Sequence, residues 1–260
     1  MNKIKTLLGR EYMLGRKKTL FGLIALAMIT VLCWLALISV KHGNLADAFA
    51  NLDKDMPGMS KRLSDLVYYA AMYAPAFVSI SLMNENGAVS ADLKSGWKLF
   101  SRTLPITPAE KIGAKYILKA IILVAVFLID LGNFAVVSAL ADREMSGVNV
   151  KALLFLINID LLSELIKCAV LYNAKTEKGT MPAEFASFSV LIILCIPYFF
   201  RLRKSLSGIT ADNEFLGTLK IMGVMAGDIK RIFPLMLPVM IILLAGGYFL
   251  HLAILRRSEI

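Results

Sequence analysis

Long apolar blocks separated by short polar stretches dominate the chain. Blocks such as 19–40, 151–173 and 232–255 each approach the roughly 20 residues that a helix needs to cross a bilayer core. The pattern predicts an all-α polytopic membrane protein with about six transmembrane helices. We expect these spans near 19–40, 64–83, 112–140, 151–173, 183–200 and 232–255.

Composition supports a membrane protein. Hydrophobic residues make up 58% of the 260 residues and charged residues only 18%, whereas soluble domains carry about a quarter charged residues. The short connections leave no room for a sizeable soluble domain, so residues 1–260 form a single transmembrane domain. The net charge of +10 is typical of a protein with cationic residues near the inner leaflet, and we expect no nucleic-acid partner.

A basic flank at residues 1–18 places the N-terminus in the cytoplasm. Lys3, Arg10 and Lys17 recur every seven residues, and Ile4, Leu7, Leu8 and Leu14 are assigned to another face, which predicts an interfacial amphipathic helix. A disordered basic tail is the alternative. Six alternating spans then put both termini in the cytoplasm. Among the Lys and Arg residues outside the predicted spans, 15 lie on the cytoplasmic side and 12 on the outer side.

Residues 201–231 are unusually basic for an outer connection. They also mix apolar residues with glycines, which suits a re-entrant segment that dips into the outer side of the membrane, where protein or water must cover its backbone. An error in the span count would place this segment inside instead.

The connection after the second span carries an aromatic edge. Leu93, Trp97 and Phe100 follow at i, i+4 and i+7 and share one helix face. Aromatic residues exposed in the cytosol favour docking on a partner protein, and contact with lipid headgroups is the alternative.

A helix start is predicted at the end of this connection. Thr107 is a natural N-cap, Pro108 suits the first helical position, and Glu110 completes a capping box. Lys111, Lys115 and Lys119 then follow at four-residue spacing on one side. We expect them to reach toward lipid phosphates.

The stretch KLFSRTLPITPAEKIGAKY, together with the basic N-terminal helix and the order of spans, resembles the membrane subunits of ABC type-2 exporters. The similarity is to the small six-span permeases of bacterial peptide and multidrug exporters, including those for phenol-soluble modulins. It implies a bacterial plasma-membrane exporter of amphipathic peptides or hydrophobic, drug-like compounds. It also implies a coupling segment at 85–111, with the coupling helix itself at 90–102. The residues it assigns to the ATPase contact are Leu93, Trp97, Phe100, Leu104 and Pro105.

The resemblance also implies partners. Two copies of a separate ATPase would hold ATP and magnesium, so no cofactor is expected on this chain. A second permease copy, identical or related, would complete the pathway.

Ionisable residues at membrane depth are candidates for function because burying them is costly. Asp130 lies in the third span, and Asp160, Glu164 and Lys167 share a face of the fourth. Glu164 can pair with Lys167, which leaves two aspartates near Asn133 and Asn158. We expect either a hydrated vestibule for a cationic or amphipathic substrate or polar contacts that hold helices together.

An enzyme is not expected. The chain has no GxxxxGK[ST] phosphate loop, and its two histidines, His42 and His251, lie at predicted membrane edges. The alternative function is a proton-coupled secondary transporter, or an accessory membrane protein, that uses Asp130 and Asp160. Such transporters often show paired repeats, which this sequence lacks.

Overall fold

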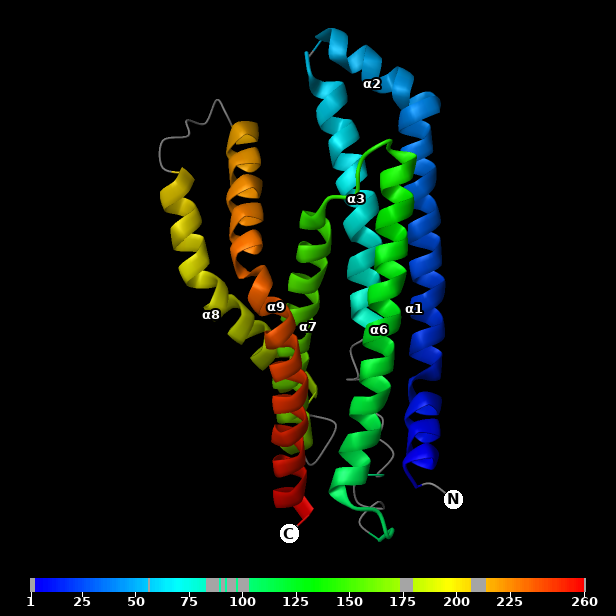
Figure 1. Cartoon of the computed structure of the whole chain (residues 1–260), viewed down its shortest axis with the longest axis vertical. Helices are drawn as coiled ribbons and strands as arrows, with labels where there is room; N and C mark the ends of the chain where they lie inside the picture. Colours follow the sequence, from blue (N-terminus) through cyan, green and yellow to red (C-terminus); the bar gives the residue numbers. More distant parts are fainter. Residues whose placement is uncertain are drawn as a thin grey trace. The chain divides into compact units, whose positions relative to one another are not determined.

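The computed structural model describes residues 3–55, 57–82, 89, 92, 97, 103–173, 180–206 and 214–259. Within this part the chain is all-helical, with seven helices (Figure 1). They are α1 (Lys3–His42), α2 (Asn44–Asp55), α3 (Met59–Leu82), α6 (Pro108–Leu140), α7 (Gly147–Asn173), α8 (Thr180–Leu206) and α9 (Glu214–Glu259).

The chain divides into two compact units. Unit 1 comprises Met1–Leu14, Asn84–Leu118 and Leu154–Ile260, and unit 2 comprises Gly15–Met83 and Lys119–Leu153. The helices α1, α6 and α7 each contribute one part to each unit.

Four helices in the described part are long and apolar enough to cross a membrane, namely α1, α3, α6 and Arg231–Arg257 of α9. They leave large apolar side chains exposed, such as Phe21, Phe77 and Ile241, which a bilayer would cover. The chain is therefore a multi-pass membrane protein.

The two remaining predicted spans correspond to α7 and α8. The 27-residue α7 carries Lys151, Asp160, Glu164 and Lys167, and it is not among the four apolar helices. Several side chains of α8 lie outside the described residues. Four of the six predicted spans are thus supported in the described part of the chain.

Some predicted boundaries differ from the structure. Instead of an interfacial helix at 1–18 followed by a span, α1 is one helix of 40 residues, because Arg16, Lys17 and Lys18 favour helix and nothing stops it. The connection between α1 and α3 contains α2, and Gly58 takes a positive φ of 82° in the turn before α3. At the other end of the chain, α9 runs unbroken through Pro234 and Pro238.

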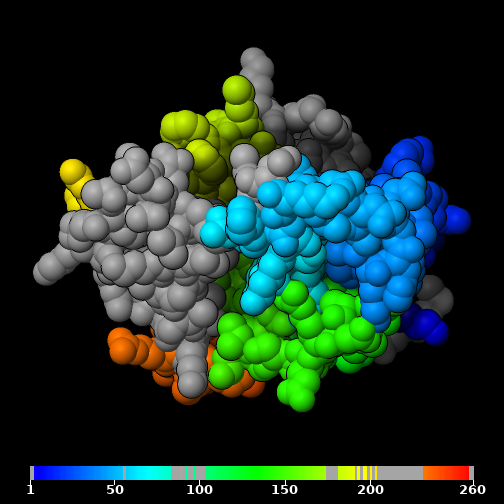
Figure 2. All heavy atoms as spheres, turned by 90° about the horizontal axis from the view of Figure 1, so that it is seen from above, coloured from blue at the N-terminus to red at the C-terminus, as the bar shows by residue number. Residues whose placement is uncertain are grey.

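The end of α6 is tied to α1 and α3 in unit 2. Asp142 adopts a left-handed conformation, with φ of 51°, and ends the helix. Its carboxylate pairs with Lys41, while Arg143 pairs with Asp65 and lies 4.4 Å from the centre of the Tyr68 ring. Figure 2 accordingly shows the blue and cyan turn through α2 beside green residues.

Unit 1 has its own apolar core. It joins the start of α6, the ends of α7 and α9, and the start of α8. The buried residues of this core are Val89, Ile112, Cys168, Leu171, Tyr172, Ala183 and Leu255.

Candidate functional site

The start of α6 has the predicted capping box. The backbone N–H of Thr107 donates to the Glu110 carboxylate at 2.8 Å, and the N–H of Glu110 donates to Thr107 Oγ1 at 3.2 Å. Pro108 is the first helical residue, so the predicted helix start is confirmed. The Thr107 backbone and hydroxyl donors lower the pKa of Glu110 below its ordinary value.

Next to this helix start, four charged residues form an ion-pair cluster. The Lys115 ammonium lies 2.9 Å from Glu11 Oε2 and 3.0 Å from Asp92 Oδ2. Arg10 pairs with the same two carboxylates. Its Nη1 lies 2.8 Å from Glu11 Oε1, and its Nη2 forms an ion pair with Asp92 Oδ1. Two cations thus balance two anions, and the cluster joins α1, α6 and the segment between α3 and α6.

The prediction that Lys111, Lys115 and Lys119 reach lipid phosphates is wrong. All three are buried, with at most 8% of their surface exposed. Lys115 turns toward protein because Glu11 and Asp92 provide carboxylates there.

Trp97 faces this cluster as well. The guanidinium carbon of Arg10 lies 3.8 Å from the centre of its ring, a cation–π geometry. Pro105 is exposed, and its carbonyl accepts a hydrogen bond from Lys3 Nζ at 2.9 Å. Leu104 is half-buried, whereas Leu93 and Phe100 lie outside the described residues.

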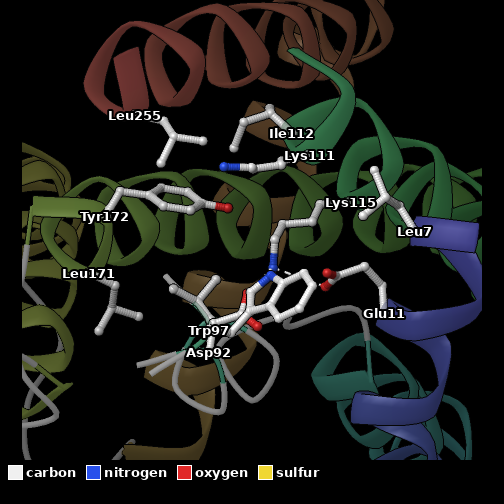
Figure 3. A pocket seen from close by; sticks show the side chains of 11 residues that line it. Leu7, Glu11, Asp92, Trp97, Lys111, Ile112, Lys115, Leu171, Tyr172 and Leu255 are labelled. Atoms are coloured by element: carbon white, nitrogen blue, oxygen red, sulfur yellow. Dashed lines mark hydrogen bonds and ion pairs between the residues drawn. The ribbon is translucent and has the colours of Figure 1, made fainter. Parts of the chain in front are cut away.

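A cavity of about 50 Å³ lies between these residues (Figure 3). It is much smaller than a ligand pocket of roughly 300 Å³ and has room for only a few water molecules. Its lining includes Leu7, Glu11, Val89, Asp92, Trp97, Lys111, Ile112, Lys115, Leu171, Tyr172 and Leu255. The cluster is therefore a structural and electrostatic junction, not a substrate site.

His251 forms a second polar junction in unit 1. Its Nε2 lies 3.2 Å from the Leu165 carbonyl oxygen, which can only accept, so Nε2 carries the hydrogen. In the neutral ring Nδ1 then accepts from the Tyr116 hydroxyl at 2.8 Å. These bonds connect α6, α7 and α9.

Unit 2 contains the predicted site residue Asp130. It is fully buried, and both of its carboxylate oxygens lie within hydrogen-bond distance of Ser79 Oγ, at 2.8 and 2.7 Å. Asn133 accepts from Trp34 Nε1 at 3.1 Å and donates to the Ala71 carbonyl at 3.2 Å. The side-chain partner of Asp130 is thus Ser79, which the sequence did not indicate.

Asp160, Glu164 and Lys167 of α7 belong to unit 1, whereas Asp130 belongs to unit 2, so the predicted proximity of Asp130 and Asp160 stays a hypothesis. Asp160 is half-buried, and Glu164 is 1% exposed. Lys167 Nζ lies 3.9 Å from Glu184 Oε1 on α8. Next to these charges, Asn158 donates to the Met236 carbonyl and holds α7 against α9.

Sequence reasoning also missed Arg10, Glu11 and Asp92 as a group. Glu11 is the single acid within the basic N-terminal flank, and this isolation was the one signal that could have identified it. Asp92 lies 82 positions after Arg10, and Lys115 lies 104 positions after Glu11, so no local pattern links α1 to these two residues.

A comparison with protein-family profiles matches residues 56–245 to the ABC-2 family transporter proteins. The chain belongs to this family. As an ABC-2 membrane permease it is a transport subunit without a catalytic domain, and its family generally implies a partner ATPase. The searches of curated proteins and of solved structures each found no match to this ABC-2 protein.

Proposed function

We propose that this ABC-2 protein is the permease subunit of an ATP-driven exporter in a bacterial plasma membrane. The family match over residues 56–245 carries the proposal. Two copies, or this chain and a related permease, would assemble with two ATPase chains that bind ATP and magnesium. About six spans and cytoplasmic termini belong to the same proposal, with 201–231 as an outer re-entrant segment.

The segment 85–111 would be the contact with the ATPase. Its Asp92 pairs with Arg10 and Lys115, and its Trp97 lies under Arg10. A displacement of this segment would therefore be transmitted directly to α1 and α6. Leu93, Phe100, Leu104 and Pro105 complete the proposed contact.

Amphipathic peptides or hydrophobic, drug-like compounds are the proposed substrates. Asp130, Asp160, Glu164 and Lys167 are the proposed polar groups of their pathway. Family membership favours this function over a proton-coupled secondary transporter, because ABC-2 proteins generally work with an ATPase.

Co-purification with the neighbouring ATPase tests the proposal. We expect the wild-type chain in detergent to retain the ATPase, and Leu93→Asp and Trp97→Ala to lose it. Trp97→Phe keeps a ring under Arg10 and should retain it. Phe249→Ala, which removes an exposed aromatic residue of α9, is the matched control.

If the wild type retains no ATPase under conditions that keep it folded, the exporter proposal is wrong. If Trp97→Ala loses the ATPase but Leu93→Asp retains it, Trp97 acts through Arg10 and not through contact with the ATPase.

The topology has a separate test. A single cysteine at Arg203, in a background without Cys33, Cys168 and Cys195, should react with a membrane-impermeant maleimide added outside intact cells. Reaction only after the cells are permeabilised would place this segment in the cytoplasm.

A further inference from the structure

Unit 2 contains a crevice of about 290 Å³, near the lower end of the size range of small-molecule sites. Its walls come from α1, α3 and α6, which lie side by side in Figure 1. Most of the lining is apolar, including Leu26, Pro75 and Ile129. The polar side chains in the lining are Thr30, Trp34, Asp130 and Asn133.

Asp130 belongs to this apolar wall, and its carboxylate is fully buried within it. The hydroxyl of Ser79 carries one hydrogen and also lies 2.9 Å from the Ala76 carbonyl oxygen, so it can donate to at most one of the two carboxylate oxygens at a time. In the described part of the chain, no Lys, Arg or His side chain lies within ion-pair distance of Asp130. Buried anions usually have a cationic partner, so the crevice offers an uncompensated position for a cation.

Trp34 gives the crevice a fixed aromatic wall. Its indole N–H donates to Asn133 Oδ1 at 3.1 Å. The amide nitrogen of Asn133 is in turn held by the carbonyls of Ala71 and Met72, at 3.2 and 3.4 Å. An aromatic ring held in this way attracts a cation next to it, most strongly where water is excluded.

We propose that this crevice binds the cationic group of a lipophilic monocation, with Asp130 as counter-ion and Trp34 as aromatic wall. The inference rests on the proposed exporter function, and it specifies the substrate class as compounds or peptide side chains that carry one positive charge on an apolar body.

The test uses phenyltrimethylammonium, which has a permanent charge, and its neutral isostere tert-butylbenzene. Trp34 and Trp97 are the two tryptophans of the chain. In a Trp97→Phe background, the fluorescence of Trp34 therefore reports on the crevice directly. Titrations use the full chain in nanodiscs without ATPase.

Two variants change the crevice in different ways. Asp130→Asn removes the charge and keeps the shape. Gly132→Leu fills the crevice, since a Cβ added at Gly132 meets no atom within 4 Å. Gly246→Leu on α9 is the matched control, because Gly246 also has open space around its added Cβ.

We expect saturable binding of phenyltrimethylammonium in the parent and in Gly246→Leu. Asp130→Asn should weaken it about tenfold or more, as when one partner of a buried charge pair is removed, and Gly132→Leu should abolish it. Binding of tert-butylbenzene should not change with Asp130→Asn.

Absence of saturable binding in the parent would overturn the proposal. So would equal affinity of the parent and a folded Asp130→Asn variant, or equal affinity of the parent and Gly132→Leu. Because no ATPase is present, cation binding and ATPase retention can fail separately, and each failure identifies the proposal that is wrong.

Discussion

Arg10 pairs with the carboxylate of Asp92 and lies 3.8 Å from the centre of the Trp97 ring. One side chain of α1 thereby contacts two residues of the connection between α3 and α6. Through Lys115, which pairs with the same aspartate, the contact extends to α6. The arrangement links the basic N-terminal stretch to a segment 82 positions further along the chain.

Arg10→Ala should reduce ATPase retention, because it removes the guanidinium from the Trp97 ring and leaves Asp92 with only Lys115 in the cluster. Arg10→Lys keeps a charge but loses the planar group over the ring, so an intermediate effect is expected. The measurement is co-purification, with Arg16→Ala, an exposed arginine on the same helix, as control. Unchanged retention in Arg10→Ala would separate this contact from ATPase docking.

Lys115→Met should destabilise the protein by about 3 kcal/mol, because it leaves Glu11 and Asp92 as buried charges with less compensation. Adding Glu11→Gln should recover part of this loss. The unfolding midpoint in detergent is measured for both variants and the wild type. A double variant no more stable than Lys115→Met would contradict the ion-pair account.

Ser79→Ala removes the hydroxyl within hydrogen-bond distance of Asp130 and of the Ala76 carbonyl. If Asp130 is the acceptor, the loss should be about 1.5 to 3 kcal/mol, the range for a hydrogen bond to a charged group. Ser81→Ala on the same helix is the control, because Ser81 is exposed and its hydroxyl bonds only the Val78 carbonyl. Thermal unfolding of both variants should show a decrease for Ser79→Ala alone.

Gly247→Ala should destabilise unit 1, since an added Cβ would lie 2.5 Å from the Tyr116 hydroxyl. Tyr116→Phe removes that hydroxyl, so Gly247→Ala should cost less in the Tyr116→Phe background. Gly246→Ala has open space around its added Cβ and should be neutral. Equal costs of Gly247→Ala in both backgrounds would show that the hydroxyl is not the obstacle.

The capping box should respond to pH. The pKa of Glu110 is lowered from 4.5 by the Thr107 donors, so the folded state favours the charged carboxylate. The stabilisation is complete above pH 4.5 and is lost as the pH falls through the lowered pKa. Thr107→Ala should therefore reduce the unfolding midpoint at pH 7, and the difference from wild type should shrink in acid.

The sequence alone determined the class of protein and the local structure. Several apolar blocks of about 20 residues indicate a membrane, because the chain has no large soluble domain that could bury them and their length matches a bilayer core. The helix start at Thr107 was equally readable, since capping depends on residues three positions apart.

Only the tertiary structure decided which charges meet. Lys115 was predicted to face lipid, yet Glu11 and Asp92, from distant parts of the chain, draw it inward. Asp130 was recognisable as a costly buried charge, but its Ser79 partner and the crevice beside Trp34 depend on how three helices pack. Sequence spacing fixes which residues share a helix face, whereas the partner of each face is set by packing between helices.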